Sequence, residues 1–502
     1  EAARARNLYN LQGFIFMAKI LRRIAAAVMC AAALATFIAL PACAQNGRDG
    51  RDGEDFNFYD MYEAVNAERV QNGEERLTVS EFVEMYFGMT SGEVQEAISQ
   101  QAIMNRSLLS SVTIMADYTT SAPIFGTASH EVYAGSGVIV DVDTTEGDAY
   151  IVTNAHVVYE SDYGYCEDLY VYLYGSDEEG ADYYSDSRSG ALVNVNGIPS
   201  SQVEIIGVSR QYDLAVLKVE DSEVIRRSNA VAAQFAQDEY VVAGESVYAV
   251  GNADGLGLSI TRGIISRESE WTNVALSENA DGSVNLDDVM SYRVMRTDAA
   301  VNGGNSGGGL FNYNGEMVGI INSKNEADGI DNMAYALPTT YARRVVQSMI
   351  DTYEESGAVR YVEKAVLGVT VTTRDSYSVY DSERGETLIR ETVGVQNVER
   401  NSAAHSILRA DDVILSFAVG TFEGGTDGAY TERSENFTVP QDTDYLVSPH
   451  YFSIDVTRQY NATDAMFSVR MGDTVEVVVE RNGVQKYCYI TFDSSSYFTR
   501  YA

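Results

Sequence analysis

Residues 303–309 read Gly-Gly-Asn-Ser-Gly-Gly-Gly and set one hydroxyl, that of Ser306, among glycines. An apolar run, 317–321, follows after Asn314-Gly315, a pair that favours a tight two-residue hairpin turn. Because glycine has no Cβ, backbone N–H groups in such a loop can turn toward a point that bulkier residues would block. The stretch therefore predicts a loop between two strands of a β fold, with Ser306 on that loop.

Short apolar runs separated by Gly, Asn and Asp continue around this loop, from about residue 111 to residue 324. Many short strands with frequent turn signals are typical of a barrel or sandwich. Helical spacing of apolar residues around Val345 and Met349, ended by Gly357, predicts a closing helix. A second β-rich block follows, with a polar insertion at about 421–461.

The sequence contains four histidines, so few residues can serve as a general base. His156 follows the apolar run 150–153, and Asp213 directly precedes the apolar run 214–217. A hydroxyl becomes a nucleophile when an imidazole takes its proton and a carboxylate holds that imidazole in the right tautomer. We therefore predict Ser306 as nucleophile, His156 as general base and Asp213 as the residue that orients the base.

Each of these signals has a structural explanation when it stands alone. A histidine after a strand is more often structural, an aspartate before a strand is usually a turn residue, and a Gly-rich loop with serine is usually only a loop. The chain order His, Asp, Ser, with all three at strand ends, is what favours catalysis. The backbone N–H groups of Gly304 and Ser306 are then the predicted oxyanion hole.

A second assignment treats residues 304–308 as the Gly-x-Ser-x-Gly elbow of α/β-hydrolases, with Asp411 and His450 as acid and base. That elbow needs a helix directly after the turn, whereas glycines and a hairpin follow Ser306. The first assignment is therefore favoured. His130, His405 and His450 are expected to pack or to face solvent.

Four segments, in order, resemble the motifs of the HtrA/Deg family of trypsin-like serine proteases: Thr153–Val158, Asp213–Lys218, Gly251–Gly257 and Thr297–Ala300 leading to Gly304–Gly308. The resemblance covers about residues 111–495. It implies a mainly β fold, a chymotrypsin-like double β-barrel followed by a PDZ domain, with no cofactor or metal. It also implies a serine endopeptidase that cleaves exposed or misfolded polypeptide segments, and a homotrimer.

The sequence departs from the family pattern at the nucleophile loop. The family usually has proline where Gly303 and Gly309 stand, which leaves the rigidity of the loop to be tested. Asn305 precedes the serine, where digestive trypsin-like enzymes carry an aspartate that pairs with a newly cut N-terminus. Activation by N-terminal cleavage is therefore not expected.

The resemblance also implies two substrate-binding elements. A PDZ carboxylate loop, which captures the C-terminus of a peptide, is expected at Leu367, Gly368 and Val369. An S1 wall is expected at Met333, Ala334 and Tyr335. The rival function is a peptide-binding chaperone or scaffold that works through the PDZ block.

The N-terminal stretch resembles a secretory signal. Three cations, the last at Arg23, precede an apolar run over 24–40, and Pro-Ala-Cys43 follows. This ending resembles the bacterial lipoprotein box, in which the cysteine is lipidated. We expect Cys43 to anchor the protein to the outer face of the cytoplasmic membrane or elsewhere in the cell envelope; a retained transmembrane span is the alternative.

These features divide the chain into five predicted parts: 1–43, signal peptide and lipoprotein box; 44–55, a Gly/Arg/Asp spacer; 56–110, a helical region; 111–357, a trypsin-like protease domain; and 360–495, a PDZ-like domain with the insertion.

The amino-acid composition limits the classes of partner that the protein can bind. The chain has 35 Lys and Arg against 73 Asp and Glu, a formal net charge of −38, which repels nucleic-acid phosphates. Nucleic-acid binding is not expected.

Asp143 and Asp148 around Gly147 faintly resemble a calcium loop, but without a closing glutamate a hairpin turn is predicted. Cys166 and Cys488 are expected to be unpaired thiols.

Overall fold

The computed structural model describes residues 100–501 apart from 122–128, 177–183, 186–191, 194–196, 237–240, 276–288, 325–332, 358–360, 383–384 and 442–444, together with eight residues between 62 and 85. The chain forms two compact units, Glu1–Asn105 and Arg106–Ala502. The predicted signal peptide, Cys43 and the spacer lie outside the described residues. In the described part of the chain, no helix is long and apolar enough to cross a membrane.

A few side chains of the first unit are described. Tyr62 and Phe82 are buried and pack edge to face, with ring centroids 5.4 Å apart. Tyr62 Oη and Asn66 Nδ2 both donate to the carbonyl oxygen of Leu77, at 2.8 Å and 3.2 Å. Helix α5 (Gln100–Leu109) closes the predicted region and leads into the first strand of the second unit.

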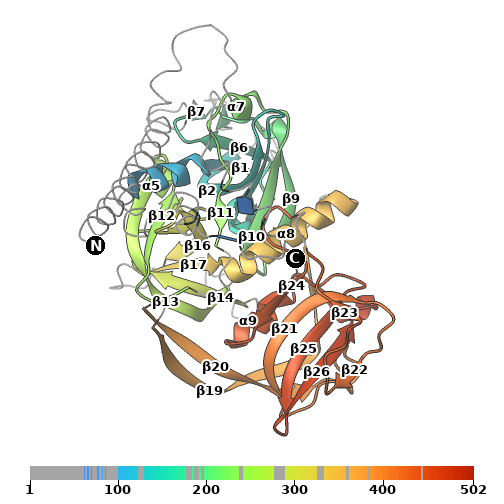
Figure 1. Cartoon of the computed structure of the whole chain (residues 1–502). Helices are drawn as coiled ribbons and strands as arrows, with labels where there is room; N and C mark the ends of the chain where they lie inside the picture. The colour runs from blue at the N-terminus through green and yellow to red at the C-terminus, as the bar shows by residue number, and fades with distance from the viewer. Residues whose placement is uncertain are drawn as a thin grey trace, which may run out of the picture. The chain divides into compact units, whose positions relative to one another are not determined.

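Six strands of the second unit form a barrel-like sheet in the order β6–β1–β2–β3–β10–β9 (Figure 1). Alternate residues such as Ile114, Ile151 and Leu217 are fully buried and form its core. Val171 of the edge strand β6 forms an isolated bridge with Ile198, which lies shortly before the strand at the opposite edge, β9. The strands are β1 (Ser111–Ser121), β2 (Ser129–Asp143), β3 (Asp148–Thr153), β6 (Asp168–Leu173), β9 (Val203–Ser209) and β10 (Leu214–Val219).

Short elements surround this sheet. They are α6 (Ala155–Val158), β4 (Tyr159–Glu160), β5 (Gly164–Tyr165), β7 (Tyr184–Ser185), β8 (Leu192–Val193), the 3-10 helix η1 (Ser200–Gln202) and α7 (Glu223–Arg226). Two of them, α6 and α7, add Ala155, Val157, Val158 and Ile225 to its core.

A second sheet has the order β11–β16–β15–β12–β13–β14–β17, and β17 pairs back onto β16, so six of its strands close into a barrel. The strands are β11 (Gln234–Phe235), β12 (Ser246–Gly251), β13 (Ser259–Ala275), β14 (Val289–Thr297), β15 (Gly309–Asn312), β16 (Glu316–Lys324) and β17 (Ala334–Pro338), with the 3-10 helix η2 (Ala253–Gly255) after β12. The predicted mainly β fold with two barrels is confirmed.

The hairpin after the nucleophile loop differs from the predicted two-residue turn. Strand β15 ends at Asn312 and β16 begins at Glu316, so three residues connect them. Gly315 has φ +79°, a conformation that favours glycine. The Asn312 side chain accepts the backbone N–H groups of Asn314 and Glu316, at 3.0 Å and 2.9 Å, and this capping stabilises the longer turn.

Helix α8 (Thr339–Ser356) follows the second barrel and ends at Gly357, as the sequence predicts. Val345, Val346 and Met349 are buried in a core to which both barrels contribute. The helix therefore joins the two barrels through one continuous hydrophobic core.

The C-terminal strands form a separate sheet in the order β19–β20–β21–β25–β26–β22, with β23 and β24 paired to β21. The predicted insertion thus supplies three of its strands, and the pair β18–β27 extends the fold to residue 501, beyond the predicted boundary. Its elements are β18 (Val362–Ala365), β19 (Val369–Asp381), β20 (Glu386–Val398), β21 (Val413–Phe422), β22 (Gly428–Tyr430), β23 (Phe437–Thr438), β24 (Phe452–Asp455), α9 (Gln459–Ala465), β25 (Thr474–Arg481), β26 (Val484–Thr491), η3 (Ser495–Tyr497) and β27 (Phe498–Tyr501). This strand-rich region is consistent with a PDZ domain.

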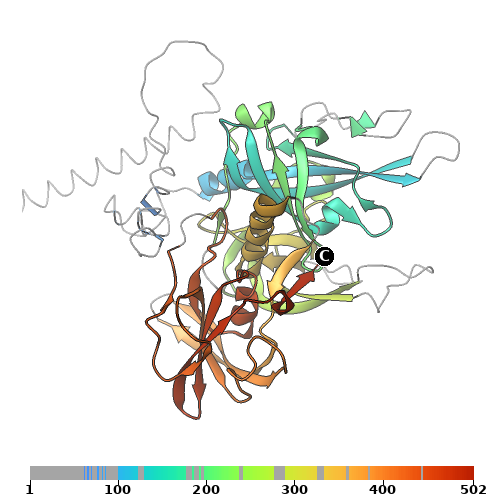
Figure 2. The ribbon, with the colours of Figure 1, turned by 90° about the vertical axis from the view of Figure 1, so that its right-hand side faces the viewer.

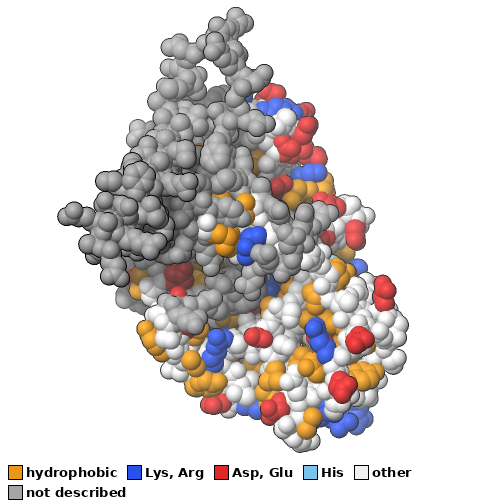
Figure 3. All heavy atoms as spheres, viewed as in Figure 1, with side chains coloured by type: hydrophobic (Ala, Val, Ile, Leu, Met, Phe, Trp, Pro, Cys, Tyr) orange, Lys and Arg blue, Asp and Glu red, His pale blue; other side chains and the backbone are white. Residues whose placement is uncertain are grey.

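The C-terminal sheet packs firmly against the barrels (Figure 2). Val447 and Phe467 belong to the same buried core as the residues of α8. The Phe467 ring meets Tyr212 edge to face at 4.7 Å. Gln347 Oε1 accepts the N–H of Val447 at 2.9 Å. On the face seen in Figure 3, charged side chains of both signs are scattered over this domain without a basic patch.

We expect Phe467→Ala to lower the free energy of unfolding by about 3–5 kcal/mol, because it removes a buried ring from the core that both barrels share. Urea unfolding followed by circular dichroism should show one transition for residues 106–502. Phe437→Ala is the matched control, since that ring packs only within the C-terminal sheet. A separate C-terminal transition, with the remaining midpoint unchanged by Phe467→Ala, would contradict a shared core.

Candidate active site

His156 and Asp213 meet at the ends of neighbouring strands. His156 lies in the single turn of α6, directly after β3, and Asp213 directly precedes β10, which pairs with β3. The Nδ1 atom of His156 is 2.8 Å from Asp213 Oδ2, and the backbone N–H of His156 donates to Oδ1 at 3.0 Å. Both carboxylate oxygens therefore bind the same residue, which fixes the orientation of the imidazole.

The backbone of Asp213 is held in an uncommon conformation. Its φ is +48°, a region that aspartate visits more readily than most residues but that still carries strain. Its N–H donates to the carbonyl oxygen of Arg210 at 3.3 Å, and its carbonyl oxygen accepts from Asn154 Nδ2 at 2.9 Å. Asn154 is fully buried, so this contact ties the loop of the carboxylate to the start of the helix of the base.

The two side chains differ in exposure: 49% for His156 and 10% for Asp213. The imidazole can thus reach a substrate while the carboxylate stays shielded. Desolvation lowers the pKa of His156, but the charge of Asp213 and its hydrogen bond raise it more, so the pKa lies above the usual 6.5. This balance stabilises the imidazolium that forms when His156 accepts a proton.

The nucleophile loop is held by Ser136 of the first barrel. The N–H of Ser136 donates to the carbonyl oxygen of Ser306 at 2.8 Å, and its hydroxyl donates to the carbonyl oxygen of Gly304 at 2.7 Å. The same hydroxyl accepts the N–H of Asn252 at 2.8 Å. A residue of one barrel therefore fixes the backbone of a loop in the other.

The two predicted oxyanion donors are left available. The carbonyl oxygen of Gly303 accepts from the N–H of Asp254 at 2.6 Å, so the N–H of Gly304, across the same trans peptide bond, points the opposite way. Within the described residues, neither Gly304 N–H nor Ser306 N–H has an acceptor. The loop adopts this arrangement with glycine at both 303 and 309.

The hydroxyl of Ser306 does not bond to the base in this structure. Its hydrogen bond among the described residues runs to the carbonyl oxygen of Asn322, at 3.0 Å. Nucleophilic attack requires the hydroxyl to turn from that carbonyl toward Nε2 of His156.

Asn322, on β16, is a site residue that sequence reasoning missed. Its Nδ2 donates to Asp213 Oδ2 at 2.5 Å, and its side chain is 2% exposed. Its backbone carbonyl holds the Ser306 hydroxyl, so one residue contacts both the nucleophile and the orienting carboxylate. In the sequence, Asn322 is only the first residue of a polar stretch that follows the apolar run 317–321.

The predicted S1 residues lie on and just before β17. Ala334 is buried, whereas Met333 and Tyr335 are half-buried and touch through Tyr335 Oη and Met333 Sδ, 3.4 Å apart. Arg296 also reaches Met333 Sδ, at 3.9 Å.

The predicted carboxylate loop lies at the start of β19, an edge strand of the C-terminal sheet. Gly368 has φ +67°, and a Cβ there would be 2.1 Å from Ser402 Cβ. Its carbonyl oxygen accepts the N–H of Glu399 at 2.8 Å. In the described part of the chain, the N–H groups of Leu367 and Gly368 have no acceptor.

The remaining histidines lie apart from Ser306. His130 pairs with Asp117 at 2.9 Å, His450 pairs with Asp473 at 2.7 Å, and His405 is exposed. His450 is thus bound to a carboxylate other than Asp411, whereas the α/β-hydrolase assignment requires His450 to pair with Asp411. Cys166 and Cys488 form no disulfide.

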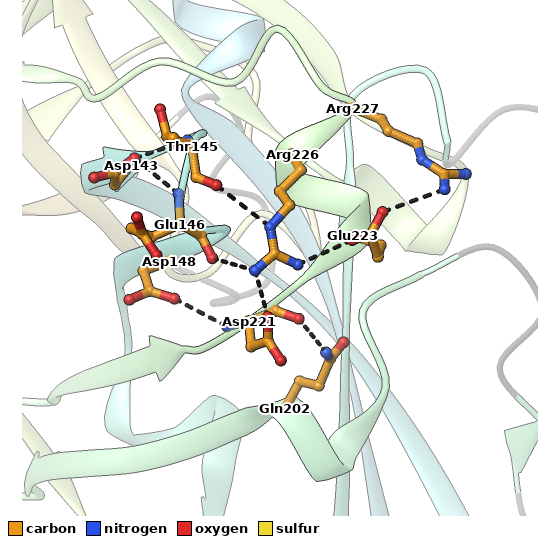
Figure 4. A network of polar contacts seen from close by, with 9 residues as sticks. All are labelled: Asp143, Thr145, Glu146, Asp148, Gln202, Asp221, Glu223, Arg226 and Arg227. Carbon is orange, nitrogen blue, oxygen red and sulfur yellow. Dashed lines mark hydrogen bonds and ion pairs between the residues drawn. The ribbon is translucent and has the colours of Figure 1, made fainter.

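A turn, and not an ion site, occupies the segment that resembles a calcium loop (Figure 4). Asp143 Oδ1 accepts the N–H groups of Thr145 and Glu146, at 2.7 Å and 3.0 Å. The guanidinium of Arg226 donates to the carbonyl oxygen of Glu146 at 2.7 Å. An arginine cation therefore already satisfies the oxygens of this turn. The described residues contain no group of three His, Cys, Asp or Glu that could hold a metal ion.

Comparison with known proteins agrees with this geometry. Residues 135–320 match the model of the trypsin-like peptidase domain. The periplasmic serine endoprotease DegP of Escherichia coli (strain K12) is 28% identical over 284 residues, which is 56% of this chain and 48% of DegP. The serine protease Do-like HtrA of Bacillus subtilis (strain 168) is 26% identical over 321 residues, 61% of this chain and 60% of that protein. A solved structure of the HtrA-type protease AlgW with a decapeptide covers 78% of this chain and 98% of its own, at 21% identity and a TM-score of 0.41.

The two barrels, the His156–Asp213 pair and the matched domain define a trypsin-like peptidase domain. The relatives are serine proteases of the HtrA/Deg kind, and this chain is similar to them over 56–61% of its length. It spans about half the length of DegP.

We expect Gly304→Ala to lower kcat/KM on a peptide substrate by about 10²–10³-fold, because the added Cβ would displace the N–H of residue 304 and the loss of one oxyanion donor has an effect of this size. A Cβ at Gly304 would be 2.2 Å from the carbonyl oxygen of Asn252, and its φ of +89° disfavours alanine. Gly303→Ala is the matched control, because a Cβ there meets nothing within 4 Å. Equal kcat/KM values for the two variants would contradict the assignment of the Gly304 N–H to the oxyanion hole.

Proposed function

We propose that this protein is a serine endopeptidase that works through an acyl-enzyme. The observation that carries the proposal is the double contact of His156 with Asp213 beside the loop of Ser306, where two N–H groups have no acceptor among the residues that the structure describes. Nucleophile, base, orienting carboxylate and oxyanion donors are the complete set of groups that acyl transfer requires.

In the proposed reaction, His156 Nε2 takes the proton of the Ser306 hydroxyl as its oxygen attacks the carbonyl carbon of the substrate. The N–H groups of Gly304 and Ser306 stabilise the oxyanion. His156 then gives the proton to the leaving amine, the C–N bond breaks, and an acyl-enzyme remains. Water, deprotonated by His156, attacks the ester and releases the acid. Asp213 stays ionised throughout and stabilises the imidazolium.

We propose exposed or misfolded segments of polypeptides outside the cytoplasm as substrates. Met333, Ala334 and Tyr335 form the proposed S1 wall and favour small or medium apolar side chains. The carboxylate loop at Leu367, Gly368 and Val369 is the proposed site for peptide C-termini, since an edge strand with free N–H groups can accept a peptide as an added strand. A homotrimer belongs to the same proposal.

A fluorophosphonate probe tests the proposed activity, because only an activated serine reacts with it. Wild type should be labelled and should cleave casein, whereas Ser306→Ala should do neither. Labelling should slow as the pH falls through a value above 6.5, because the raised pKa of His156 protonates the base there. A folded wild type that binds peptides but is neither labelled nor active would establish the chaperone alternative instead.

We also propose that Cys43 is lipidated and holds the protein on the membrane. Cys43→Ala should then move the protein from the membrane pellet to the soluble fraction, because the spacer at 44–55 holds few apolar residues to retain it. Cys30→Ala is the matched control and should stay in the pellet. Fractionation that leaves the Cys43→Ala variant in the pellet would favour a retained transmembrane span.

A further inference from the structure

A buried tyrosine lies behind the catalytic carboxylate. Tyr292, on β14, is 2% exposed and belongs to the core that both barrels share. Its hydroxyl donates to Asn322 Oδ1 at 3.0 Å. The other end of that amide, Nδ2, donates to Asp213 Oδ2, the oxygen that also binds His156 Nδ1.

The chemistry of the three side chains fixes the direction of these hydrogen bonds. The ionised carboxylate of Asp213 only accepts hydrogen bonds, so Asn322 must present its NH₂ group to it. The amide oxygen then faces Tyr292, and a tyrosine hydroxyl has one proton to give. If Asn322 turned its amide over, its oxygen would face the carboxylate and its NH₂ group would face the hydroxyl. With Tyr292 as donor, the observed orientation is the favoured one.

We propose that Tyr292 is a positioning residue for catalysis, which holds the Asn322 amide so that it orients the carboxylate of Asp213 and, through it, His156. The proposal rests on the proposed peptidase activity. Burial and the nearby charge of Asp213 both raise the pKa of Tyr292, so the hydroxyl keeps its proton over the working range of pH. The Tyr292 hydroxyl can therefore donate to Asn322 throughout that pH range.

The competing explanation is that Tyr292 only fills the core and that its hydroxyl bonds to the nearest acceptor. Tyr341 offers a direct comparison. It is equally buried in the same core, and its hydroxyl donates to the backbone carbonyl oxygen of Arg293 at 3.3 Å. Loss of either hydroxyl removes one buried hydrogen bond, but only the hydroxyl of Tyr292 contacts Asn322.

The test compares Tyr292→Phe with Tyr341→Phe in the full chain. We expect Tyr292→Phe to lower kcat on a short peptide by about three- to tenfold with KM unchanged, the range that one net hydrogen bond represents. Tyr341→Phe should lower the thermal midpoint to a similar extent and leave kcat unchanged. In an Asn322→Ala background, Tyr292→Phe should have no further effect on kcat, because its action passes through that amide.

A second readout does not require activity. In protein labelled with ¹⁵N-histidine, the Nδ1 proton of His156 should shift in Tyr292→Phe and stay in place in Tyr341→Phe. Equal kcat values for wild type and Tyr292→Phe, or additive losses in the Asn322→Ala background, would overturn the proposal. A wild type that cleaves nothing would contradict the proposed function but not the positioning role of Tyr292. The resonance of His156 would then test that role. An unchanged signal in Tyr292→Phe would overturn it.

Discussion

The carboxylate of Asp213 is the point on which the site depends. It accepts three hydrogen bonds, from the backbone and side chain of His156 and from Asn322. A carboxylate that is 10% exposed needs such donors, because an unpaired buried charge is costly. The same bonds align the imidazole, so the groups that solvate the charge also set the geometry for catalysis. The strained φ of Asp213 is maintained because its neighbours on both sides are tightly packed.

That packing reaches into the C-terminal domain. Tyr212, the residue before Asp213, lies between the rings of Phe467 and Tyr501, at 4.7 Å and 5.4 Å. Beside it, Arg293 of β14 pairs with Asp464 of α9 in a buried contact. Removing one partner of such a pair leaves an uncompensated charge, so the contact disfavours separation of the two domains. The C-terminal sheet is thus part of the support of the loop that carries Asp213 and not a freely tethered module.

The sequence was sufficient to predict what depends on local pattern. Strand runs and turn residues predicted a barrel or sandwich, the residues around His156, Asp213 and Ser306 predicted the candidate triad, and the resemblance to HtrA/Deg proteases implied two barrels. The sequence was insufficient where the outcome depends on contacts between distant segments. Asn322 looks like any polar residue at a strand end until β16 pairs beside the nucleophile loop, and Tyr292 looks like an ordinary core aromatic. The longer hairpin at 313–315 arose because Asn312 caps it, which dipeptide preferences do not include.

Because Ser136 links the two barrels, the site can assemble only after both barrels have folded. This one residue of the first barrel fastens the backbone of Ser306 and Gly304, which the second barrel supplies. Neither barrel holds a complete set of reacting groups, since the imidazole and carboxylate come from the first and the hydroxyl from the second. A newly made chain therefore has no assembled site until both barrels have folded and met.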